Sequence, residues 1–372
     1  MEKAVHRTLK KLFIILCLLV PLSVAAESGI ARAWKKFDNW LLRSQLMGID
    51  TNYVQLPKLN HQVYIGSYTY WQGYQMNMPF FMEDASTILP GIKDKDHYRL
   101  NAYTWQGEIE LGLDWKGLAL ELPIPIYNNY RYSLGLAKNG SIWGARFRYK
   151  HLRQMDGNCN LGDLSLNNDK NNINIFFIEG YYVLMHKKFS LSAGLYADMV
   201  QRRSAGSPLI YLNYYHSSYN LKDLFPANYD SFRTNQVSLG LGYAYNLSFL
   251  QGRLVFHASV VPMFSIYNHL KHRVGHSSTF FTSREQNEEA KAAAKAASGL
   301  TEEQWNAFYN AADNGSARFR VNAFARFAVN YSFNRFIVSF LANYRHYAYS
   351  NDLNLQIRNQ EADMQFNFCV RF

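Results

Sequence analysis

The sequence predicts an all-β protein, a transmembrane antiparallel up-and-down β-barrel of about twelve strands, within a range of ten to fourteen. Three observations predict it. Apolar and polar residues alternate along many stretches of about ten residues or more, which is long enough for a tilted strand to cross a bilayer. Short connections alternate with long ones along the chain. Aromatic residues make up 16% of the 372 residues, and they gather near the edges of the apolar stretches, as in interfacial girdles.

Residues 1–26 are expected to be a secretory signal peptide. A basic start containing Lys3, Arg7, Lys10 and Lys11 precedes the short apolar run 12–20, and Val24-Ala25-Ala26 supplies small residues before Glu27. The run is too short to span a bilayer as a helix. A retained anchor is the alternative interpretation.

Residues 27–58 are expected to form a periplasmic N-terminal segment with an amphipathic helix over 30–46. Ile30, Trp34, Phe37 and Leu41 recur at helical spacing, and basic residues occupy the opposite side. Tryptophan beside basic residues is typical of a helix that lies in the lipid headgroup plane. The alternative is an ordinary periplasmic helix packed against the mouth of the barrel.

Residues 59–372 are predicted to form the barrel. In the final segment, Met364, Phe366 and Phe368 share one face, while Gln365 and Asn367 share the other. The same reading gives strands at 61–71, 98–115, 117–126, 130–138, 141–155, 171–186, 188–202, 232–248, 251–271, 316–333, 335–349 and 361–372.

The connections support this order. Tight turns are expected around Lys116, at Asn139-Gly140 (a type I′ hairpin signal), around Lys187, at 249–250 and at Asn334. Long connections are expected at 72–97, 156–170, 203–231, 272–315 and 350–360, with 127–129 as a short exception. Short turns on one side and long loops on the other are typical of outer-membrane barrels, and an even strand count places both termini on the periplasmic side.

Residues 285–312 interrupt the β pattern, and a helical insertion in an external loop is predicted there. The stretch is rich in Ala, Glu and Lys, and Thr301 followed by Gln304 is typical of a capping box. The insertion is interpreted either as a lid or partner-binding element, or as a solvated loop with local helicity.

Charged residues confined to the polar parity of the strands are the predicted functional feature. Arg or Lys facing lipid at the bilayer midplane would cost about 2–4 kcal/mol, so these side chains are expected to line the lumen. They either select solutes in an aqueous pore or close the lumen as an Arg–Glu network. The predicted lumen-lining residues are Glu108, Glu110, Glu121, Arg146, Arg148, Lys150, Arg318, Arg320 and Arg326.

Other candidate chemistry is weak. His257 and Ser259 resemble the strand-borne base and nucleophile of outer-membrane phospholipases, but here their parity is that of the lumen and no third group is identified. His269, His272 and His276 have a spacing that can bind zinc or copper, yet no Cys or acid completes the set. We therefore predict no catalytic residue, no metal site and no cofactor. Charge spread over the strands, without a binding module, argues against a nucleic-acid partner.

The chain ends in Phe372 after an alternating strand, which resembles the C-terminal recognition signal of bacterial outer-membrane proteins. The segments 50–54, the strand at His61 and the hairpin after Asp114-Trp115 resemble an uncharacterised domain-of-unknown-function family of predicted Gram-negative outer-membrane barrels, over about 50–372. The resemblance implies the barrel fold, outer-membrane lipid as surroundings and the barrel-assembly machinery as a partner through Phe372. It transfers no catalytic residue.

These observations predict a protein of the bacterial outer membrane that is not an enzyme. Its expected role is passage or binding of a small solute of unknown identity, or loop-mediated interaction. A lipid-modifying enzyme of phospholipase or acyltransferase type, and a structural or assembly component of the membrane, are the alternatives.

Overall fold

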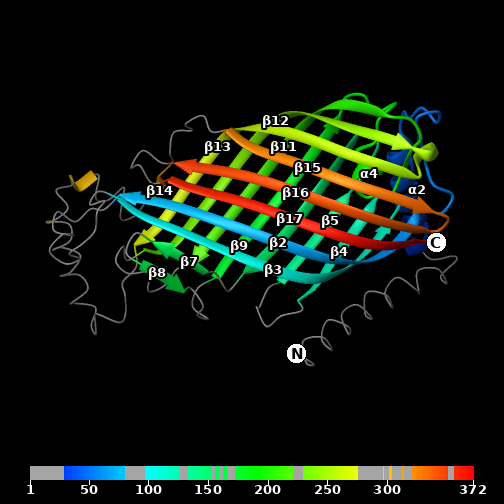
Figure 1. The fold of residues 1–372 in the computed structure, drawn as a ribbon. Helices are drawn as coiled ribbons and strands as arrows, with labels where there is room; N and C mark the ends of the chain where they lie inside the picture. Colours follow the sequence, from blue (N-terminus) through cyan, green and yellow to red (C-terminus); the bar gives the residue numbers. More distant parts are fainter. Residues whose placement is uncertain are drawn as a thin grey trace.

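A computed structural model describes residues 29–79, 97–125, 132–152, 156–159, 162–165, 172–220, 229–274, 296, 301–303, 312–313, 321–350 and 356–372. Within these residues, twelve antiparallel strands form a closed barrel (Figure 1). The predicted fold class is thus confirmed. The barrel strands are β2 (His61–Pro79), β3 (His97–Trp115), β4 (Leu118–Pro125), β5 (Tyr132–Lys138), β6 (Trp143–Leu152), β9 (Asn172–Val183), β11 (Ala205–Asn220), β12 (Tyr229–Phe249), β13 (Leu254–Val274), β15 (Val321–Phe333), β16 (Phe336–Ser350) and β17 (Gln356–Arg371).

Each barrel strand pairs with the next one along the chain, and β17 closes the ring onto β2. The closing register sets Cys369 opposite Tyr64, and the amide of Phe372 donates to the carbonyl of His61 over 2.9 Å. Three short strands extend the sheet: β7 (Asp156–Cys159) on β3, β8 (Gly162–Ser165) on β7, and β14 (Ala312–Asp313) on β13. We call the end that carries the tight turns and the C-terminus the turn end, and the opposite end the loop end.

The outer wall is apolar over the height of a bilayer core. On β12, the outward positions between Leu239 and Phe249 hold only leucine, tyrosine and phenylalanine, and Leu241 is 61% exposed. Ten residues at ~3.4 Å per residue, tilted by roughly 40°, give a band about 26 Å tall. This matches the apolar band of about 25 Å that membrane barrels present to lipid.

The tight turn between β3 and β4 takes the left-handed backbone that such a hairpin needs. Lys116 and Gly117 between β3 and β4 both have positive φ, of 52° and 78°. Gly117 is also required by space, because a Cβ there would lie 2.4 Å from the carbonyl oxygen of Asn139. The predicted type I′ turn at Asn139-Gly140 is wrong, since neither residue has a positive φ and the connection runs over four residues from 139 to 142.

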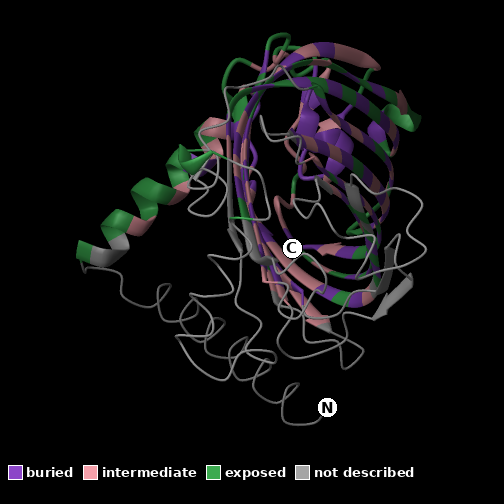
Figure 2. Cartoon of the chain, turned by 90° about the vertical axis from the view of Figure 1, so that its left-hand side faces the viewer, coloured by how far each residue is buried: buried purple, intermediate pink, exposed green. Residues whose placement is uncertain are grey.

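The predicted strand 188–202, the tight turn at Lys187 and the long loop 203–231 are also wrong. Residues 184–204, which we call the plug, form a long connection at the turn end instead. It contains the short helix α4 (Leu191–Leu195) and the two-residue strand β10 (Val200–Gln201). The barrel wall resumes at β11, within the predicted loop. Viewed along the barrel from the loop end, the buried helix α4 of the plug lies inside the wall (Figure 2).

Local chemistry explains the misplaced strand. Apolar residues at odd positions from Phe189 to Met199 imitate a strand, but the hydroxyl of Ser190 accepts the amide of Ala193 over 3.2 Å and caps a helix. Pro208 lies near the start of β11. It is tolerated because β11 pairs with β9 only from Leu209 onward, so no ladder hydrogen bond to β9 is lost there.

The helix α2 (Gly29–Leu46) packs on the tight turns at the turn end. Asp38 accepts hydrogen bonds from the indole of Trp115 at 2.9 Å and from the ammonium of Lys116 at 2.5 Å. Ser141 donates its amide to the carbonyl of Ser44 over 3.1 Å. None of the helices in the described part of the chain is long and apolar enough to cross a membrane.

Several predictions concern residues outside the described ranges. They are the signal peptide 1–26, all of the helical insertion 285–312 except residues 296, 301–303 and 312, and the residues Arg318, Arg320 and His276.

Candidate functional site

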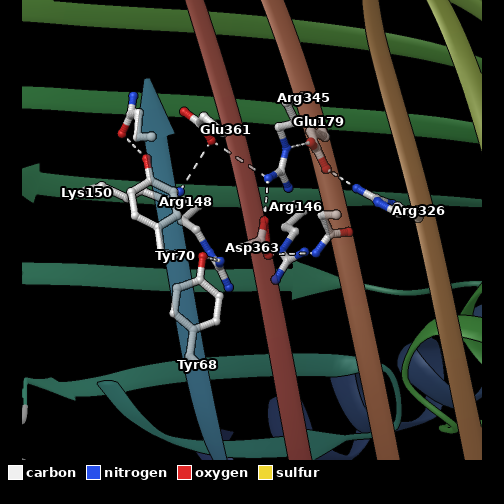
Figure 3. Close-up of polar contacts among 12 residues, drawn as sticks. Tyr68, Tyr70, Arg146, Arg148, Lys150, Glu179, Arg326, Arg345, Glu361 and Asp363 are labelled. Carbon is white, nitrogen blue, oxygen red and sulfur yellow. Dashed lines mark hydrogen bonds and ion pairs between the residues drawn. The ribbon is translucent and has the colours of Figure 1, made fainter. Parts of the chain in front are cut away.

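Charged side chains from several strands meet in the barrel interior (Figure 3). The seven described members of the predicted lumen set, Glu108, Glu110, Glu121, Arg146, Arg148, Lys150 and Arg326, are all buried. They project from β3, β4, β6 and β15, at positions that alternate with outward apolar residues. The structure adds four buried partners that were not among them, namely Glu179, Arg345, Glu361 and Asp363. We call these eleven residues the ionic belt.

One part of the belt connects strands that lie close together in the wall. Arg146 donates through Nη2 to both carboxylate oxygens of Glu121, at 2.7 and 2.9 Å. Arg148 donates to the same carboxylate, to the hydroxyl of Tyr68 at 3.1 Å, and pairs with Glu110 at 3.7 Å. Glu121 therefore pairs with two buried guanidinium groups, and Glu110 supplies a second negative charge beside Arg148.

The other part reaches across the lumen. Glu179 on β9 accepts from Nη2 of Arg326 at 2.5 Å and from Nε of Arg345 at 3.2 Å, although β16 lies five positions from β9 in the ring. The ammonium of Lys150 on β6 approaches Glu361 on β17, again five positions away, at 3.4 Å. Since six positions is the farthest separation in a twelve-membered ring, these pairs span the interior.

Aromatic side chains fill the lumen between the belt and the loop end. The rings of Tyr215 and Tyr347, on strands four positions apart, stack with centroids 4.1 Å apart, and Tyr74 meets Tyr219 edge-on at 5.0 Å. The hydroxyl of Tyr215 donates to Glu361 at 3.3 Å, which joins this layer to the belt. All of these tyrosines are at most 1% exposed, so the layer is tightly packed.

The plug fills the lumen on the other side of the belt. Wall side chains donate to its backbone: Asn330 to the carbonyl of Gly194 at 2.5 Å, Asn246 to that of Ser190 at 2.7 Å, and Gln62 to that of Tyr196 at 3.0 Å. The hydroxyl of Tyr196 accepts from Nη1 of Arg146 at 3.2 Å. The plug is thereby bonded to the belt as well as to the wall.

The N-terminal segment binds the plug through backbone hydrogen bonds. The two-residue strand β1 (Val54–Gln55) pairs antiparallel with β10, and the amide of Arg202 donates to the carbonyl of Tyr53 at 2.7 Å. Asp50 donates its amide to the carbonyl of Lys187, also at 2.7 Å. Residues before the barrel thus hold a segment in its interior, a long-range contact that strand periodicity does not predict.

His257 and Ser259 face the lumen as predicted from their parity, and the structure supplies a third group. The ring Nδ1 of His257 lies 2.7 Å from Oδ1 of Asn246, and Nε2 lies 3.1 Å from the hydroxyl of Ser259. The hydrogen-bonded series Asn246–His257–Ser259 has the same order of orienting group, base and hydroxyl as the catalytic triad of serine hydrolases. It is closed off, because all three side chains are buried and a Cβ on Gly194 of the plug would lie 2.6 Å from Nδ1 of His257.

Within the described residues, no group of three or more His, Cys, Asp or Glu could hold a metal ion. The predicted histidine cluster is not tested by this, because His276 lies outside those residues and the side chain of His272 is not described.

Comparison with known proteins gives a family but no activity. The model of a family described as domain of unknown function (DUF4421) matches residues 49–372. The chain belongs to this family. No curated protein matches the chain in sequence. The DUF4421 match begins just before the segment that fastens the plug, so the family region includes the fastening as well as the barrel.

Solved structures are similar only at a distance. The outer membrane protease OmpT from Escherichia coli is 6% identical, with a TM-score of 0.35, over 84% of this chain and 96% of that one. The translocator domain of the autotransporter NalP from Neisseria meningitidis is 10% identical, with a TM-score of 0.31, over 94% and 99%. The P. putida toluene transporter TodX is 6% identical, with a TM-score of 0.22, over 85% and 91%.

One buried carboxyl group in the plug is expected to make the stability of the protein depend on pH. Burial raises the pKa of Asp198, and the hydroxyl of Ser192 and the cations Lys138 and Arg371 offset part of that rise. A carboxyl group whose pKa is raised in the folded protein stabilises the fold fully at pH values below its pKa in the unfolded protein. This contribution is lost as the pH rises from the pKa of the unfolded protein through the raised pKa of the folded one. We expect Asp198→Asn to be more stable than the wild type at pH 7 and equal to it near pH 3. Urea unfolding at both pH values measures this, and an equal gap at both would contradict it.

Proposed function

We propose that this protein is an outer-membrane barrel with a closed interior, and that it acts without enzymatic chemistry by binding at its loop end rather than as a diffusion pore. The observation that carries the proposal is the set of ion pairs that join opposite walls of the lumen, such as Glu179 with Arg345. The tyrosine layer and the plug add two further obstructions in series. An interior crossed at three levels leaves the rim and the outer wall as the surfaces that meet other molecules.

The membrane location is supported by the outer surface. Large apolar side chains such as Trp105, Leu241 and Val260 are at least 60% exposed, which is costly in water and favourable in lipid. The buried charges occupy the opposite parity. A barrel with this polarity is expected to insert in a bilayer, and even-numbered antiparallel barrels of this kind are typical of the bacterial outer membrane.

Planar-bilayer recording tests the closed interior. Purified, refolded wild-type protein is expected to give no steady single-channel conductance in 1 M KCl, because no continuous water path crosses the belt. Heat-modifiable migration on a gel shows independently that the inserted protein is folded. Reproducible open-channel steps from such protein would overturn the proposal in favour of an aqueous pore.

A lipid-modifying enzyme is the second candidate, because Asn246, His257 and Ser259 form a hydrogen-bonded chain. Their burial under the plug opposes it, since a nucleophile must reach its substrate. We expect the wild type to give only background phospholipid turnover in mixed micelles, and Ser259→Ala to give the same value. Turnover by the wild type that disappears in Ser259→Ala would favour the enzyme.

We also propose that the barrel-assembly machinery recognises the C-terminus. Phe372 is 48% exposed at the end of β17 and lies against His61, with ring centroids 5.7 Å apart. An exposed terminal aromatic ring at the closing seam is available to a partner before the ring of strands is complete.

A further inference from the structure

A polar pocket lies on the outer wall near the loop end, away from the closed interior. Its volume is about 200 Å³. The outward side chains that line it come from three adjacent strands, β17, β2 and β3, and are Gln75, Asn77, Arg99, Asn101, Gln356 and Arg358. The backbone register arranges them in two rows, Arg358–Gln75–Asn101 and Gln356–Asn77–Arg99. The two arginines therefore lie diagonally across β2.

A tryptophan pair indicates the level of this pocket relative to the membrane. Trp71 and Trp105 are paired in the register directly below it, with ring centroids 6.4 Å apart, and Trp105 is 64% exposed. Exposed tryptophans mark the level where acyl chains meet headgroups. Gln75 is four residues farther along β2, which places it about 10 Å closer to the loop end for a tilted strand. The pocket thus lies at the level of the lipid headgroups at the loop end.

The chemistry of the lining selects an anion. Beyond the tryptophan pair, the outward positions of β17, β2 and β3 in the described ranges carry no acidic residue. On the added strands, Asp156 of β7 lies opposite Tyr103, and Asp163 of β8 lies two strands from Asn101 in the register row that contains Arg358. Guanidinium groups bind phosphate through paired N–H donors, and amide side chains add neutral donors. The Cα atoms of the two arginines are roughly 12 Å apart, a span that two long side chains can close around one headgroup.

We propose that this pocket binds the phosphate group of a membrane-lipid headgroup. Arg358 and Arg99 are the cationic contacts to the phosphate, and Gln75, Asn77, Asn101 and Gln356 are hydrogen-bonding neighbours. The proposal rests on the membrane location given under the proposed function. The lipid would occupy the annulus around the barrel, with its acyl chains along the outward face of β2 and β3 on the turn-end side of Trp71 and Trp105. Binding of the lipid is expected to require the phosphate group of its headgroup and to weaken as the salt concentration rises.

Native mass spectrometry of the refolded full chain in detergent provides the test. The probes are lipid A with two phosphates, the same lipid without phosphate, and inorganic phosphate as a competitor. We expect Arg99→Gln combined with Arg358→Gln to lower retention of the phosphorylated lipid about tenfold and to leave retention of the dephosphorylated lipid unchanged. Arg233→Gln is the matched control, because Arg233 is an exposed outward arginine near the loop end of β12, five positions from β2 in the ring.

Equal retention by the wild type and the double variant, or an equal loss in Arg233→Gln, would overturn the proposal. Displacement of the lipid by millimolar inorganic phosphate would assign the pocket to free phosphate and overturn the lipid assignment. Heat-modifiable migration and partition into vesicles are measured on the same samples. A chain that does not enter vesicles refutes the membrane location, whereas one that enters without phosphate selectivity refutes only this inference.

Discussion

Replacing Glu121 with Ala is expected to lower the free energy of unfolding by about 3–5 kcal/mol, the largest effect of any single substitution considered in the belt. Glu121 accepts from Arg146 and Arg148, and all three side chains are buried. Removing the carboxylate leaves two guanidinium groups with much less compensation in a region that excludes water. Urea unfolding in lipid vesicles, followed by tryptophan fluorescence, measures the loss.

The matched control is Asp38→Ala, which breaks an ion pair of similar length at the surface. Asp38 and Lys116 are 2.5 Å apart, but their side chains are 23% and 13% exposed. Such a partly solvated pair contributes at most about 1 kcal/mol. A loss in Glu121→Ala no larger than that in Asp38→Ala would show that water reaches the belt, and the closed interior would be wrong.

Replacing Gly194 with Val is expected to push the plug out of its seat. A Cβ at this position would lie 2.3 Å from Oδ1 of Asn246 and 2.6 Å from Nδ1 of His257, and these two side chains are themselves hydrogen-bonded. The wall is rigid there, so the plug must move, at a cost of about 1–3 kcal/mol. The hydrogen bond from Asn330 to the carbonyl of Gly194 is expected to be lost as well.

A native thiol reports this movement. Cys369 is a free cysteine, 4% exposed, and packs with Ala197 of the plug in one apolar cluster. In a background that carries Cys17→Ser and Cys159→Ser, we expect maleimide to label Cys369 at least tenfold faster in Gly194→Val than without it. Gly107→Ala is the control, since a Cβ there meets nothing within 4 Å. Equal labelling rates in all three proteins would mean that the plug is not seated as described.

The strands of the wall were predictable because their physics is local. Alternation along 361–372 or 319–331 reflects two faces in two solvents, and this needs no knowledge of partners. The plug was not predictable in this way. Its alternating residues Leu191, Ala193 and Leu195 are all buried, and only the Ser190 cap and the contacts to the N-terminal segment distinguish it from a strand.

The belt was predicted in part for the same reason. Inward parity identified Arg146 and Arg148, and applying it to 361–372 would also have added Glu361 and Asp363. Glu179 is harder to find, because its inward neighbours Phe177 and Tyr181 are apolar and make that strand look buried on both faces. Which charge pairs with which depends on strands five positions apart in the ring, and the sequence of one strand carries no information about that.

The most direct test of the closed interior is a double-mutant cycle between Glu179 and Arg326, whose side chains meet at 2.5 Å from β9 and β15, four positions apart. The free energy of unfolding in lipid vesicles is measured for the wild type, Glu179→Gln, Arg326→Met and the double variant. A coupling energy of about 2–3 kcal/mol is expected for a pair held in a water-poor interior. A coupling below about 0.5 kcal/mol, typical of a pair exposed to water, would contradict the closed interior.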